Sequence, residues 1–185
     1  IDPLYKQLLS NYTKALKSRN IILSKRPSLN NIQLDVYETE MNTYGVQITK
    51  KRIEFLHSIE EYLSATFKKL FSIEHHLSVE LSTKCQLNKD DALSSILKKN
   101  REVDVQAGRS TYGIHLDDYT LLFDNFNSID YCSLGQQKMS YLGLLFAYIE
   151  LFGYKFGSFP IVLIDDVSGE LDRVRWENLV NYLDE

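Results

Sequence analysis

Close to its C-terminal end the chain reads Ile161-Val162-Leu163-Ile164-Asp165-Asp166. Four apolar residues that end in two acids are typical of a buried strand of the parallel type. Ligands bind at the carboxyl edge of an open α/β sheet, where these acids would lie. In a nucleotide site we expect Asp165 to hold Mg²⁺ through water and Asp166 to activate the attacking water. An ordinary strand that meets a polar turn would explain the same stretch.

A second signal lies upstream, where a helix with apolar residues nearly all round is predicted for 135–152. The stretch before it reads Ser133-Leu134-Gly135-Gln136-Gln137-Lys138. Ser and Gly at this position expose backbone N–H groups, and the helix dipole favours an anion there. An ordinary serine N-cap is the alternative interpretation of Ser133.

The order of the two signals is more specific than either alone. Ser133 precedes Asp165 by 32 residues, which is room for one helix, one loop and one strand. The acids are followed by Val167-Ser168-Gly169-Glu170-Leu171-Asp172. This order resembles the ABC ATPase superfamily, which has a Ser-x-Gly-Gln signature, a helix, a Walker B strand and a D-loop ending in Leu-Asp.

Within that superfamily the chain is similar to the RecF family over nearly its whole length. The stretches that carry the resemblance are 12–20, 34–37, 44–45, 50–55, Gly113-Ile114-His115-Leu116-Asp117-Asp118-Tyr119, 133–138, 164–167 and 170–172. The chain departs from the family pattern at Ile114, Leu116, Leu134 and Ile164. The first two changes put any role of the His115 turn in doubt. The change at Leu134 does not affect the signature, because Ser133 and Gly135 are the groups that face phosphate in the family.

The resemblance implies how the site residues divide. The signature would serve a nucleotide held by a second subunit, through Ser133, Leu134, Gly135, Gln136, Gln137 and Lys138. The D-loop would comprise Ser168, Gly169, Glu170, Leu171 and Asp172. Asp165, as Mg²⁺ ligand, and Asp166, as catalytic residue, would serve a nucleotide held by their own subunit.

One part of a nucleotide site is absent from the sequence. No Gly-x-x-x-x-Gly-Lys-Ser/Thr loop occurs, and without it the β- and γ-phosphates and Mg²⁺ lack ligands. We therefore expect a C-terminal fragment of a longer RecF-like chain that does not hydrolyse ATP by itself.

The expected fold class is α/β, with a helical arm at 1–72 joined to the C-terminal lobe of an ABC-type head at 73–185. Asp2-Pro3 is typical of a helix start, and apolar spacing predicts helices over about 4–22 and 30–71, with a kink at Gly45. In the lobe, the predicted strands are 77–81, 112–114, 119–123, 126–131 and 161–164. The predicted helices are 89–101, 135–152 and 173–183.

The net charge of −4 argues against a uniformly basic DNA-binding module. Residues 1–34, however, carry six basic residues against one acid, and 161–185 carry seven acids against two basic residues. A solvated helix face is the ordinary interpretation of the N-terminal charges. With the RecF resemblance, DNA contact by Lys14, Lys17 and Arg19 becomes a hypothesis.

Three further features have simple interpretations. His115 with Asp117 and Asp118 could bind a metal, but their spacing also fits a strand turn. His75-His76 is expected to be a solvated link. Cys85 and Cys132 lie in no metal-ligand spacing, and no apolar run is long enough for a membrane helix.

The RecF resemblance implies a cytoplasmic bacterial protein of DNA repair, replication and the SOS response. Such a protein would bind ATP and Mg²⁺, dimerise with ATP and hydrolyse it slowly. It would bind single- and double-stranded DNA at gaps and act with RecR, RecO and RecA. Two alternatives stay open: another SMC-like ATPase head, and a nucleotide-independent helical interaction module.

Overall fold

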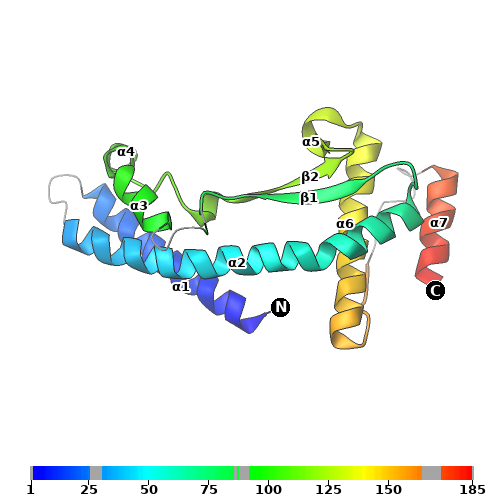
Figure 1. Ribbon diagram of the computed structural model, residues 1–185, viewed down its shortest axis with the longest axis horizontal. Helices are drawn as coiled ribbons and strands as arrows, with labels where there is room; N and C mark the ends of the chain where they lie inside the picture. The colour runs from blue at the N-terminus through cyan, green and yellow to red at the C-terminus, as the bar shows by residue number, and fades with distance from the viewer. Residues whose placement is uncertain (1, 26–30, 86, 88–91, 164–171, 185) are drawn as a thin grey trace. The chain divides into compact units, whose positions relative to one another are not determined.

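The computed structural model describes residues 2–25, 31–85, 87, 92–163 and 172–184 (Figure 1). The elements are α1 (Pro3–Ser24), α2 (Asn31–Leu70), β1 (Leu77–Ser82), α3 (Ala92–Lys99), α4 (Arg101–Ala107), the 3-10 helix η2 (Ile114–Leu116), β2 (Asp118–Phe123), β3 (Phe126–Asn127), α5 (Ser128–Tyr131), α6 (Leu134–Phe156) and α7 (Arg173–Asp184). No helix in these ranges has the length and apolar composition that a membrane crossing needs.

The chain forms two compact units. Unit 1 comprises Ile1–Glu54 and Leu81–Asp118, and unit 2 comprises Phe55–Glu80 and Tyr119–Glu185. The arm at 1–72 and the lobe at 73–185 stay a prediction.

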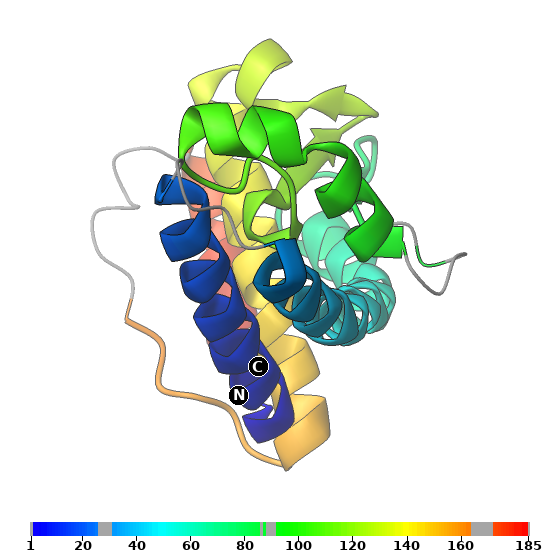
Figure 2. The ribbon, with the colours of Figure 1, turned by 90° about the vertical axis from the view of Figure 1, so that its left-hand side faces the viewer.

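The helices of unit 1 begin where local chemistry dictates. Asp2 is the N-cap of α1, and its carboxylate accepts from the backbone N–H of Leu4 at 2.8 Å, with Pro3 as the first helical residue. Figure 2 shows α1 on the outside of this unit, with α4 against its carboxyl-terminal end. The apolar core joins α1, α2, α3 and η2 through Leu8, Tyr12, Ala15, Met41, Ile48, Cys85, Leu93, Leu97 and Ile114.

Gly45 serves close packing rather than the predicted kink. It is buried in the middle of α2, which continues through it as an α-helix. A Cβ atom there would lie 2.7 Å from Leu93 Cδ2 and 3.6 Å from Tyr12 Cε2. The absent side chain therefore lets α1 and α3 approach this point of α2.

The strand predicted at 112–114 is wrong. Gly113 has φ +141°, which residues with side chains rarely adopt, and the chain then enters η2 at Ile114. The turn is held by Arg52, which donates to the Ile114 carbonyl at 3.0 Å and to Asp117 at 2.5 Å. The helix predicted for 89–101 corresponds to α3, and α4 was not predicted. Residues 89–91 lie outside the described residues.

The described strands form one sheet in the order β1-β2-β3. The predicted strands at 77–81 and 119–123 correspond to β1 and β2. A hairpin joins β2 to β3 through Asp124 and Asn125, which have φ of 50° and 67°, values that Asp and Asn tolerate. The strand predicted for 126–131 is largely wrong, because the Asn127 side chain accepts from Ile129 N–H and caps α5.

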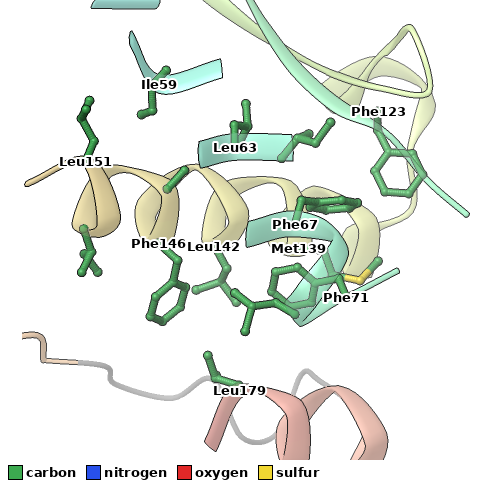
Figure 3. Close-up of a cluster of buried hydrophobic side chains, with 14 residues drawn as sticks. Ile59, Leu63, Phe67, Phe71, Phe123, Met139, Leu142, Phe146, Leu151 and Leu179 are labelled. Carbon is green, nitrogen blue, oxygen red and sulfur yellow. The ribbon is translucent and has the colours of Figure 1, made fainter. Parts of the chain in front are cut away.

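The core of unit 2 forms around α6. Figure 3 shows Phe67 of α2 and Phe71, the residue after it ends, facing Met139 and Leu142 of α6, with Leu179 of α7 below. Gly143 lies where the helices approach closely, since a Cβ atom there would lie 2.9 Å from Phe67 Cδ2. The helices predicted at 135–152 and 173–183 correspond to α6 and α7.

The described part of the predicted Walker B strand, 161–163, is not a strand. Ile161 is 93% and Leu163 92% exposed, while Val162 packs against the unit 2 core. A buried parallel strand requires neighbouring strands on its sides and helices over its faces. Among the described residues, no strand lies beside 161–163. The segment shows only an alternation of exposed and packed side chains, without the pairing that makes a strand.

Candidate functional site

The predicted signature forms the N-terminus of α6. Ser133 is the N-cap, and its hydroxyl oxygen accepts from Gln136 N–H at 3.3 Å. The Gln136 side-chain oxygen accepts from the Ser133 N–H at 2.9 Å and from its hydroxyl at 3.1 Å. This reciprocal pair is a capping box, which fixes the backbone entering the helix.

The turn before Ser133 is tied to the same helix. The Gln137 amide donates to the Ile129 carbonyl at 3.2 Å and to the Cys132 carbonyl at 3.0 Å. One side chain of α6 therefore contacts both α5 and the segment that joins α5 to α6. These contacts fix the position of the segment relative to the first turn of α6.

The signature turn is open to solvent. Ser133 and Leu134 are exposed, and a Cβ atom added at Gly135 would meet nothing within 4 Å. The first N–H groups of α6 carry the positive end of the helix dipole. The turn thus has the surface and the polarity to accept an anion such as a phosphate oxygen.

Apolar side chains border this turn. Phe126, Ile129, Tyr131 and Leu134 are between 61% and 78% exposed, and the rings of Phe126 and Tyr131 lie 6.2 Å apart between centroids. This apolar border is not predicted by the sequence pattern, which favours a strand at 126–131.

The two acids of the predicted catalytic pair, Asp165 and Asp166, lie outside the described residues, as do Ser168, Gly169, Glu170 and Leu171 of the predicted D-loop. Asp172 is described and exposed. Its carboxylate accepts from Arg175 N–H at 2.9 Å and pairs with the Arg175 guanidinium, at the start of α7. Its observed role is to cap a helix.

The prediction of DNA contact is wrong for Arg19. Its side chain is fully buried, and its guanidinium donates to Glu38, Asp104, Ser110 Oγ and the Leu97 carbonyl. No exposed charge is left for a polyanion. Lys14 and Lys17 are exposed, so for these two residues the hypothesis stands as a prediction.

The periodicity of α1 contains the signal that sequence reasoning missed. The buried residues of this helix are Leu8, Tyr12, Ala15, Arg19 and Leu23. They recur every three or four positions, which is the spacing of one helix face. Arg19 therefore continues the buried stripe, whereas the lysines do not.

The His115 turn is structural in the described residues. His115 Nδ1 lies 3.2 Å from the Tyr12 hydroxyl, and Nε2 lies 3.4 Å from the Ser110 carbonyl oxygen. Asp117 is buried and paired with Arg52. The described residues hold no group of three or more His, Cys, Asp or Glu that could bind a metal ion.

His75 is more than a solvated link. It is 39% exposed, and its Nδ1 lies 2.6 Å from the Asp124 carboxylate, which also accepts from the His76 N–H at 2.8 Å. That backbone bond, followed by the His75 contact, keeps the pKa of Asp124 below its usual value. The pair anchors the β2–β3 hairpin.

Known proteins that are similar to this chain include RecF proteins. No family model matches the chain. It is 30% identical over 174 residues to the "DNA replication and repair protein RecF" of Clostridium perfringens (strain SM101 / Type A), covering 93% of the chain and 48% of that protein. It is 32% identical over 179 residues to the protein of the same name from Streptococcus suis (strain 05ZYH33), covering 95% of the chain and 49% of that protein.

Two solved structures have the same fold as this chain. A structure of the recombination mediator protein RecF with ATP, from the RecFOR pathway, superposes with a TM-score of 0.87 at 24% identity, covering 99% of this chain and 51% of that one. A second, with an ATP analogue, gives 0.86 at 25% identity, covering 98% and 51%. The predicted α/β class is confirmed. The chain spans about half the length of the curated relatives that it matches, and it belongs to the RecF family.

Proposed function

We propose that this chain is half of a RecF-type ATPase that binds ATP between two copies of the protein and acts on DNA in repair and replication. The observation that supports this most directly is the signature turn. In a chain of the RecF family, a pre-shaped helix N-terminus leaves Ser133 exposed and the space beside Gly135 open.

The residues of the turn fit a phosphate group. The Ser133 hydroxyl donates to the Gln136 amide oxygen, and a phosphate oxygen could replace that oxygen as acceptor. Gly135 allows close approach, because nothing fills the space beside its Cα. The Gln137 contacts keep the turn in place while the acceptor changes.

We expect the acids to complete the site in the protomer that holds the nucleotide. Asp165 would contribute an oxygen to the Mg²⁺ shell, and Asp166 would orient the attacking water. Bound Mg²⁺ would supply charge neutralisation of the phosphates. Asp172 would lie at the end of the D-loop, where its contact with Arg175 begins α7.

The partners of the whole protein belong to the same proposal. A relative's structure is described within the RecFOR pathway, which supports RecO and RecR as partners. We also propose RecA loading, contact with single- and double-stranded DNA at gaps, a role in the SOS response, and a cytoplasmic bacterial location. The name shared by the curated relatives, a DNA replication and repair protein, supports this set.

Substitution of Ser133 tests the proposal in a full-length RecF protein that contains this chain. Ser133→Arg should block dimerisation with a non-hydrolysable ATP analogue, because a long side chain would separate the two copies. Nucleotide binding to the monomer should persist. Light scattering and nucleotide titration measure the two quantities.

Ser158→Arg is the matched control, since Ser158 is an exposed serine of unit 2 outside the signature. An unchanged dimer fraction in Ser133→Arg, or equal loss in Ser158→Arg, would count against the trans site. A full-length protein that binds no nucleotide would favour the nucleotide-independent helical module instead.

A further inference from the structure

Two exposed aromatic rings lie close to the signature turn in the sequence. Phe126 is 61% and Tyr131 75% exposed, and the centroids of their rings lie 6.2 Å apart. Phe126 belongs to β3, where it pairs with Phe123 across the hairpin, and Tyr131 ends α5. Large apolar side chains that lie together on a surface mark binding sites, whereas single exposed ones need no explanation. The ring pair therefore has surface available for a ligand.

The backbone between the ring pair and the turn is extended. Cys132, the residue between Tyr131 and Ser133, has φ −101° and ψ 153°. An extended residue at this position places the Cα atoms of Tyr131 and Ser133 roughly 7 Å apart. The phenol side chain of Tyr131 therefore starts beside the turn that we assign to a phosphate oxygen.

Two sets of hydrogen bonds hold α5 against α6. The buried Ser128 donates from its hydroxyl to Ser140 Oγ at 3.3 Å, and the Ser140 hydroxyl donates to the Gln136 carbonyl at 2.8 Å. The Gln137 side chain adds its two contacts to the preceding segment. Figure 1 shows α5 at the end of α6 where that helix begins. These bonds order the segment that carries Tyr131, so a ligand that contacts both this ring and the turn has less conformational freedom to remove.

Position separates this pair from other exposed aromatic residues of unit 2. Tyr154 is 79% exposed, and its ring centroid lies 6.2 Å from that of Tyr62. It therefore matches Tyr131 in residue type, in exposure and in having an aromatic neighbour. Tyr154 follows Ser133 by 21 residues, however. This separation corresponds to roughly 31 Å along the axis of α6. The two tyrosines thus differ mainly in their distance from the turn.

We propose that Tyr131, with Phe126 beside it, stacks on the base of the nucleotide whose phosphate contacts the signature turn. A nucleotide has a chain of phosphates at one end and a flat aromatic base at the other. This part of the molecule has an anion-binding turn and, two residues before it, an exposed aromatic ring. Every base has a π-face, so such a contact favours the presence of a base without choosing among bases.

This inference rests on the proposed nucleotide site between two copies of the protein. An apolar surface of the second copy is the other occupant that the ring pair could contact, together with the exposed Ile129 and Leu134. The two occupants have different requirements. A stacked base needs a flat ring at position 131, whereas an apolar protein surface accepts an aliphatic side chain of similar size. The aromatic character of both members of the pair favours the base.

The test uses a full-length RecF protein that contains this chain and a non-hydrolysable ATP analogue. Light scattering gives the analogue concentration at which half of the protein is dimeric. Tyr131→Leu keeps an apolar side chain but removes the ring, and it should raise this concentration by about tenfold. Tyr131→Phe retains the ring and should stay within about twofold of the parent protein. Analogue binding to the monomer should be unchanged in both variants, because the contact forms only between two copies.

The matched control is Tyr154→Leu, which makes the same substitution at an equally exposed tyrosine of unit 2 far along α6. It should leave the half-maximal analogue concentration within about twofold of the parent value, since exposed substitutions away from a site have small effects. Melting temperatures of the three variants establish that each one folds.

Three results would overturn the base contact. Dimerisation of Tyr131→Leu at the parent concentration would mean that the ring is not needed, as for an apolar contact between copies. Equal losses in Tyr131→Leu and Tyr154→Leu would mean that position does not matter. Weaker analogue binding to the Tyr131→Leu monomer would place the effect within one copy. Loss of the dimer in Ser133→Arg but not in Tyr131→Leu would reject the base contact alone, whereas an unchanged dimer in Ser133→Arg would reject the proposed nucleotide site itself.

Discussion

The Arg19 guanidinium donates to the Asp104 carboxylate across 2.7 Å, and neither side chain is exposed to solvent. Glu38, also fully buried, accepts from the same guanidinium at 3.0 Å. Both carboxylates have additional donors: Thr111 bonds Asp104, and Arg101 bonds Glu38. A buried cation thus joins α1, α2 and α4 in a network with matched donors and acceptors.

Arg19→Met should strongly destabilise the chain. It leaves two buried carboxylates short of their shared cation, and breaking such a pair costs about 3–5 kcal/mol. Urea unfolding measures the loss. Lys17→Met, two residues away and exposed, should change the unfolding free energy by less than about 0.5 kcal/mol. A similar small effect at both positions would contradict the network's structural role.

The neutral His115 side chain should make stability depend on pH. Burial lowers its pKa below the usual value of 6.5. The Ser110 carbonyl can only accept, so Nε2 carries the proton and Nδ1 accepts from the Tyr12 hydroxyl. The unfolded chain therefore binds a proton more readily, and the unfolding free energy should fall as pH decreases from about 7.5 through 6.5 towards 5.5.

His115→Gln isolates this contribution, since glutamine does not titrate in that range. Denaturant unfolding of both proteins at several pH values gives the difference between their pH slopes. The parent chain should lose stability more steeply on acidification. A steeper loss in His115→Gln would mean that the imidazole is charged in the folded state.

Sequence pattern predicted α1, α2, α6 and α7 well, because caps and periodicity are local. Asp2-Pro3 marks the start of α1, and the apolar stripe places the described end of α7 within one residue of the prediction. The start of α6 is local in the same way, since Ser133 and Gln136 form a capping box within four residues. Such features depend on a few neighbouring groups.

The wrong predictions concern places where residues far apart in the sequence determine the local structure. Arg19 is of a residue type that often contacts DNA, but its acidic partners, Glu38 and Asp104, lie 19 and 85 positions away in the sequence. The apolar run at 161–163 has the composition of a central strand, but a strand exists only with neighbours to pair with. The strand predicted for 126–131 stops after Phe126–Asn127, because the Asn127 side chain caps α5.

Gly143→Ala should destabilise unit 2. The added methyl group would lie 2.9 Å from Phe67 Cδ2 and 3.0 Å from Leu77 Cδ2, both in the core. Overpacking of this kind costs about 1–3 kcal/mol, which outweighs the better helix propensity of alanine. Thermal unfolding checks the sign. Stabilisation would mean that the core has room that the structure does not show.

Gly135→Ala should have the opposite effect on stability and a separate effect on function. A Cβ atom there meets nothing within 4 Å, and Gly135 lies in the first turn of α6. Alanine should therefore raise the unfolding free energy by a few tenths to about 1 kcal/mol.

In a full-length RecF protein the same methyl group would occupy the space through which a phosphate approaches the helix N-terminus. Dimerisation with a non-hydrolysable ATP analogue should weaken by roughly tenfold, about 1.4 kcal/mol. Melting curves and analogue titrations on the one variant separate these effects. If Gly135 serves only the helix, the variant will be more stable and will dimerise as well as the parent protein, and the assignment of this turn to a phosphate will be wrong.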